Sequence, residues 1–155
     1  DFCLSRGLGD VYKRQVSIGI RSWSDFWLNE GVAEYVSLLY LEHVGGREPF
    51  LNEIEKLKTR LKELTLAGPD RPLHFEGWQN EADALGQLPY VKGALFLDEL
   101  RSKIGDESFW KAMALYSQQN EGKLVDSADF QRAFQETSNV DLKSLFRRRV
   151  YGAAE

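Results

Sequence analysis

Apolar residues recur at steps of three and four along most of this chain, and this helical period constrains the fold more than any other feature. In residues 24–46 the repeating positions are Leu28, Val32, Tyr35, Val36, Leu39 and Tyr40. Ser24 has a hydroxyl suited to capping the start of this helix, and the pair Gly45-Gly46 ends it. Residues 48–66 repeat leucine and isoleucine with the same spacing, which predicts a second helix with one buried stripe.

Four further helices are expected after a long loop in residues 68–87. The loop contains His74, Phe75 and Trp78, and this aromatic content predicts that it packs against the helices. The later helices are expected to span residues 89–105, 106–122, 127–137 and 139–152, with starts at Pro89, Asp106, Ser127 and Asn139. Residues 16–23 predict one short strand, so the fold class is mainly α.

Charge, apolar length and cysteine content limit the partners and the location that the chain can have. The chain carries 20 basic and 24 acidic residues without long runs of one sign, which argues against a nucleic-acid partner. Its longest apolar stretches are too short for a bilayer span, and its N-terminus lacks the apolar run of a secretory signal, so we expect that a membrane anchor or signal could only have lain upstream. The single cysteine, Cys3, has no partner for an internal disulfide. Cysteine usage therefore does not indicate a reducing or an oxidising compartment, and the cellular location stays open.

Residues 1–15 differ from the rest of the chain. The segment DFCLSRGLGDVYKRQ follows neither a period of two nor one of 3.6, and its end resembles the adapter-derived text found at the ends of sequencing reads. We therefore expect a non-native segment at 1–15, joined between Gln15 and Val16 to a domain at 16–155.

The most informative motif is Trp27-Leu28-Asn29-Glu30-Gly31, which places a carboxylate in the first turns of an amphipathic helix. The segment SWSDFWLNEGVAEY resembles the part of the M1 aminopeptidase family, in the gluzincin clan, that follows the H-E-x-x-H helix. The resemblance implies that Glu30 is the third protein ligand of one zinc ion. In such sites zinc activates a bound water, and the glutamate of H-E-x-x-H takes its proton.

A second motif, Leu88-Pro89-Tyr90-Val91-Lys92-Gly93-Ala94, is similar to the Y-x-K-G-A segment of the same family. The resemblance implies that Tyr90 is the catalytic tyrosine, whose phenol donates a hydrogen bond to the oxyanion of the transition state. Gly93 would permit close helix packing. The resemblance covers residues 16–152 and implies the helical half of a thermolysin-like metallopeptidase catalytic domain.

The sequence departs from this family at the metal site. Family members place the second histidine nineteen residues before the glutamate ligand, which corresponds here to Val11, with Gly7 at the position of the first histidine. The histidines that are present, His43 and His74, stand in other contexts. Relatives often carry an acidic residue at the position of Ser37 that braces a zinc histidine, and Glu34, one turn after Glu30, is an alternative for that role.

Each of these residues also has a simpler interpretation. Glu30 alone is typical of a solvated helix glutamate, and Tyr90 alone is typical of a core residue with its hydroxyl at the surface. Trp27 is interpreted either as a core residue or, with Asn29, as a wall of the active site. A glycosidase pair of Glu30 and Glu34 is rejected, because such carboxylates face each other across a cleft.

The sequence therefore predicts part of a zinc aminopeptidase that removes N-terminal residues from peptide substrates, with the rest of its own catalytic domain missing. This chain alone is expected to be inactive, because Glu30 and Tyr90 cannot retain zinc without the two histidines. One alternative is a non-catalytic helical scaffold or interaction domain derived from the same fold. Another is a relative with a non-peptide substrate such as an epoxide.

Overall fold

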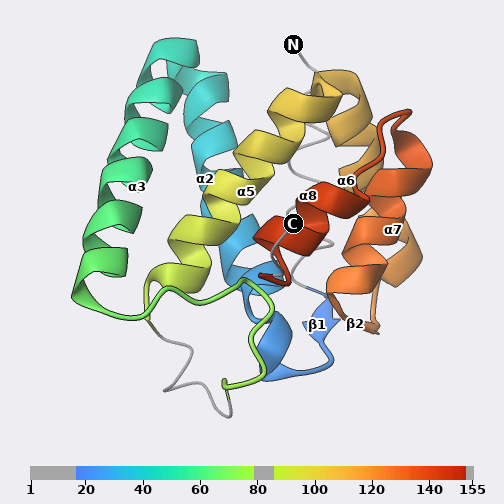
Figure 1. The fold of residues 1–155 in the computed structure, drawn as a ribbon. Helices are drawn as coiled ribbons and strands as arrows, with labels where there is room; N and C mark the ends of the chain where they lie inside the picture. The colour runs from blue at the N-terminus through green and yellow to red at the C-terminus, as the bar shows by residue number, and fades with distance from the viewer. Residues whose placement is uncertain (1–16, 79–85, 153–155) are drawn as a thin grey trace.

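A computed structural model describes residues 17–78 and 86–152 of the chain. Helices dominate the described residues, so the predicted mainly α fold is confirmed (Figure 1). The elements, in chain order, are β1 (Gly19–Ile20), the 3-10 helix η1 (Trp23–Asp25), α2 (Trp27–Gly45), α3 (Arg47–Ala67), α5 (Leu88–Ile104), α6 (Asp106–Asn120), β2 (Leu124–Val125), α7 (Ser127–Thr137) and α8 (Lys143–Arg149). The expected non-native segment 1–15 lies outside the described residues.

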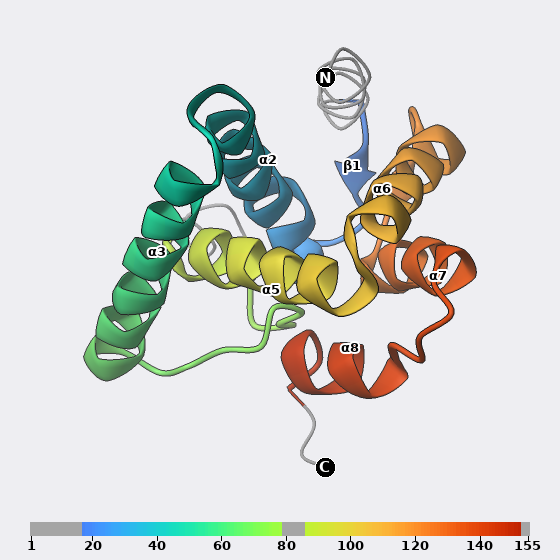
Figure 2. The same ribbon diagram turned by 90° about the horizontal axis from the view of Figure 1, so that it is seen from above.

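Helix α5 lies in the middle of the molecule. On one side it packs against α2 and α3, and on the other side it meets α6, which pairs with α7 (Figure 2). Helix α8 lies near α5 and α7 at the C-terminal end of the chain. Within the described part of the chain, no helix is both long and apolar enough to cross a membrane.

Aromatic side chains form the centre of the core between α2, α5, α7 and α8. The indole of Trp27 meets the rings of Phe96 and Phe130 edge-on, each with centroids 5.5 Å apart. Phe96 in turn meets Phe146 of α8 edge-on at 5.1 Å. All four side chains are buried, and edge-to-face pairs of this kind add to the stability gained from burial alone.

Two short strands connect the start of the described chain to the segment before α7. β1 and β2 are parallel, with Gly19 opposite Leu124 and Ile20 opposite Val125. The Arg21 guanidinium extends the contact with a 2.7 Å ion pair to Asp126. These segments are about a hundred residues apart in sequence, so the contact holds the start of the described chain against the segment before α7.

Two helix starts and one strand differ from the sequence-based expectation. Ser24 does not cap α2, because the Ser22 hydroxyl accepts a hydrogen bond from the Ser24 N–H and starts the 3-10 turn η1, after which α2 begins at Trp27. The last helix begins at Lys143 rather than Asn139, and strand β2 was not expected. The Gln135 amide holds the segment before α8 out of a helix, donating to the Val140 carbonyl and accepting from the Leu142 N–H.

A buried carboxylate joins three distant segments just before α2. Asp25 is 2% exposed, and its Oδ1 accepts hydrogen bonds from the Ser127 hydroxyl at 2.6 Å and the Ser127 N–H at 3.1 Å. The same oxygen lies 2.9 Å from Nδ1 of His74, which must donate because a carboxylate only accepts. His74 is thus a hydrogen-bonding residue of the loop, and Leu73 beside it is buried, so this part of the loop packs against the fold as expected. Residues 79–85 of the loop lie outside the described residues.

A second polar cluster joins α2, α5 and α6 at the opposite end of α2. The buried Arg101 guanidinium contacts Glu42 at 2.6 Å and both carboxylate oxygens of Asp106 at 2.9 Å. The hydrogen bond from Arg101 lowers the pKa of Asp106. Burial raises the pKa of the Tyr35 phenol, which donates to Asp98 across 3.3 Å. These contacts fix the far end of α2 against α5.

Replacing Asp25 tests whether this carboxylate stabilises the fold. Asp25→Ala leaves the Ser127 and His74 donors without their acceptor, so we expect the free energy of unfolding to fall by about 3 kcal/mol. Asp25→Asn keeps an acceptor oxygen and should cost about 1 kcal/mol. Urea denaturation followed by circular dichroism measures both losses.

The matched control is Asp70→Ala, which removes an exposed carboxylate that pairs with Lys92 at 2.7 Å. Because exposed ion pairs contribute little, this change should cost no more than about 0.5 kcal/mol. Equal losses for Asp25→Ala and Asp70→Ala would contradict a special role for Asp25.

Candidate functional site

Glu30 lies in the first turn of α2, on a half-buried part of the helix. Its backbone N–H donates to the Phe26 carbonyl, which fixes the residue in the helical turn. Its carboxylate makes no hydrogen bond or ion pair with any other described residue. Glu30 is therefore fixed in position at its backbone.

Tyr90 lies in the first turn of α5 and is also half-buried. Its ring meets Phe26, the residue before α2, edge-on with the centroids 6.2 Å apart. Phe26 in turn packs against Trp23 at 5.5 Å. A row of aromatic rings therefore connects the start of α2 to the start of α5.

Two glycines bring these helix starts together. A Cβ atom built on Gly31 would lie 2.6 Å from the Cα of Gly93 and 3.2 Å from the Pro89 carbonyl oxygen. A Cβ on Gly93 would likewise lie 2.6 Å from the Cα of Gly31. The two backbones are therefore in direct contact, which is the close packing predicted for Gly93. Because Glu30 precedes Gly31 and Tyr90 follows Pro89, the contact places both residues at the same end of the helix pair.

Trp27 lies in the core. Its side chain is fully buried, and its indole N–H donates to the Ser127 hydroxyl at 2.9 Å. Because that hydroxyl itself donates to Asp25, the first turn of α2 is tied to the start of α7 through two linked hydrogen bonds. Trp27 therefore positions the turn that carries Glu30, and its side chain does not face an open surface.

Asn29 and Glu34 lie beside Glu30 on α2 and are both half-buried. Glu34 follows Glu30 by four residues, so the two carboxylates lie on one side of the helix. Neither the Asn29 amide nor the Glu34 carboxylate is hydrogen-bonded to another described side chain. Ser37 is exposed, and its hydroxyl donates to the Glu34 carbonyl at 2.7 Å.

The described residues do not form a zinc site by themselves. Across residues 17–78 and 86–152, no group of three or more histidine, cysteine, aspartate or glutamate side chains is arranged to hold a metal ion. His43 is exposed at the end of α2, and His74 is bonded to Asp25. Gly7 and Val11, at the positions where the family has histidines, lie outside the described residues. Glu30 could thus supply one ligand of a site completed elsewhere.

Two features of this region were not recognised from the sequence. Gly31 was noted only as part of a motif, although a glycine inside an otherwise apolar helix is itself a signal of close backbone approach. The contacts among Asp25, His74 and Ser127 had no local signal, because the three residues are about fifty or more positions apart.

Most of this chain is similar in sequence to proteins of one known family. Residues 17–148 match the family model described as "Peptidase family M1 domain". Aminopeptidase N of Escherichia coli is 28% identical over 132 residues, which cover 83% of this chain and 15% of that protein. Aminopeptidase M1-A of Oryza sativa is 29% identical over 128 residues, which cover 79% of this chain and 14% of that protein.

Solved structures of the same family also resemble this chain. An M1 zinc metallopeptidase from Deinococcus radiodurans superposes with a TM-score of 0.71 and 27% identity, covering 84% of this chain and 28% of that one. A mutant of that enzyme bound to a Tyr-Ser-Ala substrate superposes with a TM-score of 0.73 and covers 88% and 29% of the two chains. This chain thus corresponds to less than a third of the length of each protein described.

Substitution of the contact glycines tests how α2 and α5 are held. Gly93→Ala places a methyl group against the backbone of α2, so the helices must separate, and we expect the free energy of unfolding to fall by about 3 kcal/mol. Gly31→Ala should cost a similar amount. Denaturation in urea measures both values.

Gly45→Ala, on α2 with Gly31, is the control. A Cβ at Gly45 would meet side-chain atoms of Pro49, the nearest at 3.4 Å, and of Leu41 at 3.7 Å, which is ordinary contact. Alanine is also the better helix former, so the loss should not exceed about 0.5 kcal/mol. If Gly93→Ala were as mild as Gly45→Ala, the proposed role of the backbone contact would be wrong.

Proposed function

The chain belongs to peptidase family M1, and from this premise we propose that it forms part of the catalytic domain of a zinc aminopeptidase. In this proposal residues 16–155 supply Glu30 as one zinc ligand and Tyr90 as a hydrogen-bond donor to the reacting carbonyl. The other zinc ligands come from outside the described residues. The substrate is a peptide, from which the complete domain removes N-terminal residues.

One observation carries this proposal. The contact between Gly31 and Gly93 brings together, from distant parts of the sequence, the two motifs that resemble the family. A solvated helix glutamate and an unrelated surface tyrosine would have no reason to lie at the same end of two closely packed helices.

Each residue has a defined task in the proposal. The Glu30 carboxylate provides an oxygen ligand of the kind that completes a zinc site with two histidines. The Tyr90 phenol donates one hydrogen bond, which is strongest when the carbonyl oxygen becomes negatively charged in the transition state. Glu34 and Asn29 lie close enough along α2 to orient the groups around Glu30. Phe26 supports the Tyr90 ring through an edge-on contact.

We further propose that this chain alone is inactive. Gly7 and Val11 occupy the positions at which the family has its two histidines, and neither side chain binds a metal. A single carboxylate does not hold zinc, because catalytic sites use about three protein ligands. The same substitutions favour the alternative of a non-catalytic helical domain, which would keep the fold without any zinc-dependent activity.

Zinc content of the purified chain checks the first part of this proposal. After incubation with zinc and gel filtration, we expect less than about 0.1 zinc ion per chain by mass spectrometry of the metal, because only one ligand is present. Hydrolysis of leucine p-nitroanilide should not exceed the background rate. A chain that retained one zinc ion and cleaved this substrate would contradict the proposed inactivity.

Two substitutions in a complete catalytic domain that contains residues 16–155 test the assigned roles. Tyr90→Phe should lower kcat by about 100-fold with zinc retained, because only the transition-state hydrogen bond is lost. Glu30→Gln should lose zinc as well as activity, because a neutral amide is a poor zinc ligand. Tyr40→Phe is the control, since Tyr40 is 59% exposed on α2 and has no proposed role. Unchanged activity of both site variants would contradict the roles assigned to Glu30 and Tyr90.

A further inference from the structure

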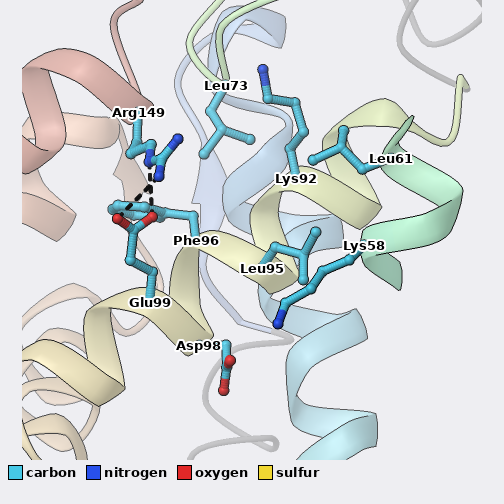
Figure 3. Close-up of a pocket in the computed structure, with 9 residues that line it drawn as sticks. All are labelled: Lys58, Leu61, Leu73, Lys92, Leu95, Phe96, Asp98, Glu99 and Arg149. Carbon is cyan, nitrogen blue, oxygen red and sulfur yellow. Dashed lines mark hydrogen bonds and ion pairs between the residues drawn. The ribbon is translucent and has the colours of Figure 1, made fainter. Parts of the chain in front are cut away.

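A cavity of about 400 Å³ lies between α3, α5, α8 and the loop that precedes α5 (Figure 3). This volume is within the range of small-molecule sites in proteins. Neither Glu30 nor Tyr90 lines it, so the cavity is separate from the candidate catalytic site. A ligand bound here would contact helices that the proposed chemistry does not use.

The middle of the cavity is apolar. Leu73 and Phe96 are buried in its wall, and Leu61 and Leu95 are half-exposed to it. Figure 3 shows the Leu61 and Leu95 side chains between the charged groups at the two ends of the cavity. An apolar group placed here would remove these leucines from water, which is favourable in proportion to the area covered.

The charged groups at one end already have partners. Arg149 makes two hydrogen bonds to Glu99, at 2.8 and 3.2 Å. Lys92 donates to Asp70 at 2.7 Å and to the Arg71 carbonyl at 2.6 Å. These contacts hold α8 and the loop against α5, so they close the cavity at that end and are not free to bind a ligand.

The other end carries two opposite charges that do not contact each other. The Lys58 ammonium and the Asp98 carboxylate both lie at this end in Figure 3, and no hydrogen bond or ion pair joins them within the described structure. Lys58 donates to Glu55 at 2.7 Å on the exposed face of α3, and Asp98 accepts from Tyr35 at 3.3 Å and from no other residue that the structure describes. An ammonium has three donors and a carboxylate has several acceptor positions, so both retain unused hydrogen-bonding capacity.

We propose that this cavity binds a free α-amino acid with an apolar side chain. The ligand's ammonium group donates to Asp98, its carboxylate accepts from Lys58, and its side chain lies on Leu61 and Leu95. An α-amino acid fits because it carries both charges at one end and an apolar group at the other, which matches the distribution of groups in the cavity. The inference does not depend on the proposed catalytic function.

The test is a titration of the isotope-labelled full chain with L-leucine, followed by the backbone amide signals in NMR spectra. We expect the signals of α3 and α5 around Leu61 and Leu95 to shift, with a dissociation constant on the order of 1 mM for so small a ligand. Lys58→Met and Asp98→Asn should each weaken binding about tenfold. Asp98→Asn keeps an acceptor for Tyr35, and Lys58 is exposed, so both variants should fold.

Lys56→Met is the matched control, because Lys56 lies on the same helix, pairs with Glu53 and does not line the cavity. It should bind leucine like the unchanged chain. Leucinol and 4-methylpentanoate, each lacking one of the two charged groups, should bind about tenfold more weakly than leucine.

Three results would overturn the proposal. The first is the absence of any shift at 20 mM leucine, roughly twentyfold above the expected constant. The second is equal binding of leucine and 4-methylpentanoate, which would make the site one for apolar acids. The third is a set of shifts confined to residues around Glu30 and Tyr90, which would place the amino acid at the candidate catalytic site.

Discussion

The backbone contact between Gly31 and Gly93 is the interaction on which the rest of this structure depends. It lets α2 and α5 approach until a Cβ atom on either glycine would lie 2.6 Å from the other's Cα. Any larger side chain would push the helices apart, and the buried aromatic rings behind them would lose contact. Because Glu30 and Tyr90 are each adjacent to this crossing, the same contact that packs the core also positions the candidate site.

Two polar clusters fix the ends of α2 on either side of this crossing. At the start, Asp25 connects the helix to Ser127 and to His74. At the far end, Arg101 connects it to α5 and α6 through Glu42 and Asp106. Burying such charged groups is favourable only with good hydrogen-bonding geometry, so the clusters restrict how α2 can slide or rotate. The Asp25 cluster and the Arg101 cluster together set the direction of the turn that carries Glu30.

The sequence predicted those parts of the structure that depend on local pattern. Helical periods located α2, α3, α5, α6 and α7, and two motifs identified Glu30 and Tyr90 as candidates without showing that they lie at the same end of one helix pair. The 3-10 turn at Trp23–Asp25 and the late start of α8 were missed, because side-chain hydrogen bonds decide them. The Ser22 hydroxyl accepts from the Ser24 N–H, and the Gln135 amide bonds to the Val140 carbonyl and the Leu142 N–H. Strand β2, the Asp25 cluster and the cavity beside Asp98 depend on segments far apart in sequence, for which a single sequence gives no signal.

The proposed function requires a zinc site that this chain shares with residues outside the described structure. The most direct test is the DNA sequence of the source locus across the Gln15–Val16 junction. The proposed function predicts an H-E-x-x-H motif in frame, with its second histidine nineteen residues before Glu30. If the locus instead encodes DFCLSRGLGDVYKRQ directly before Val16, the catalytic proposal is contradicted, and a non-catalytic helical domain is the better account.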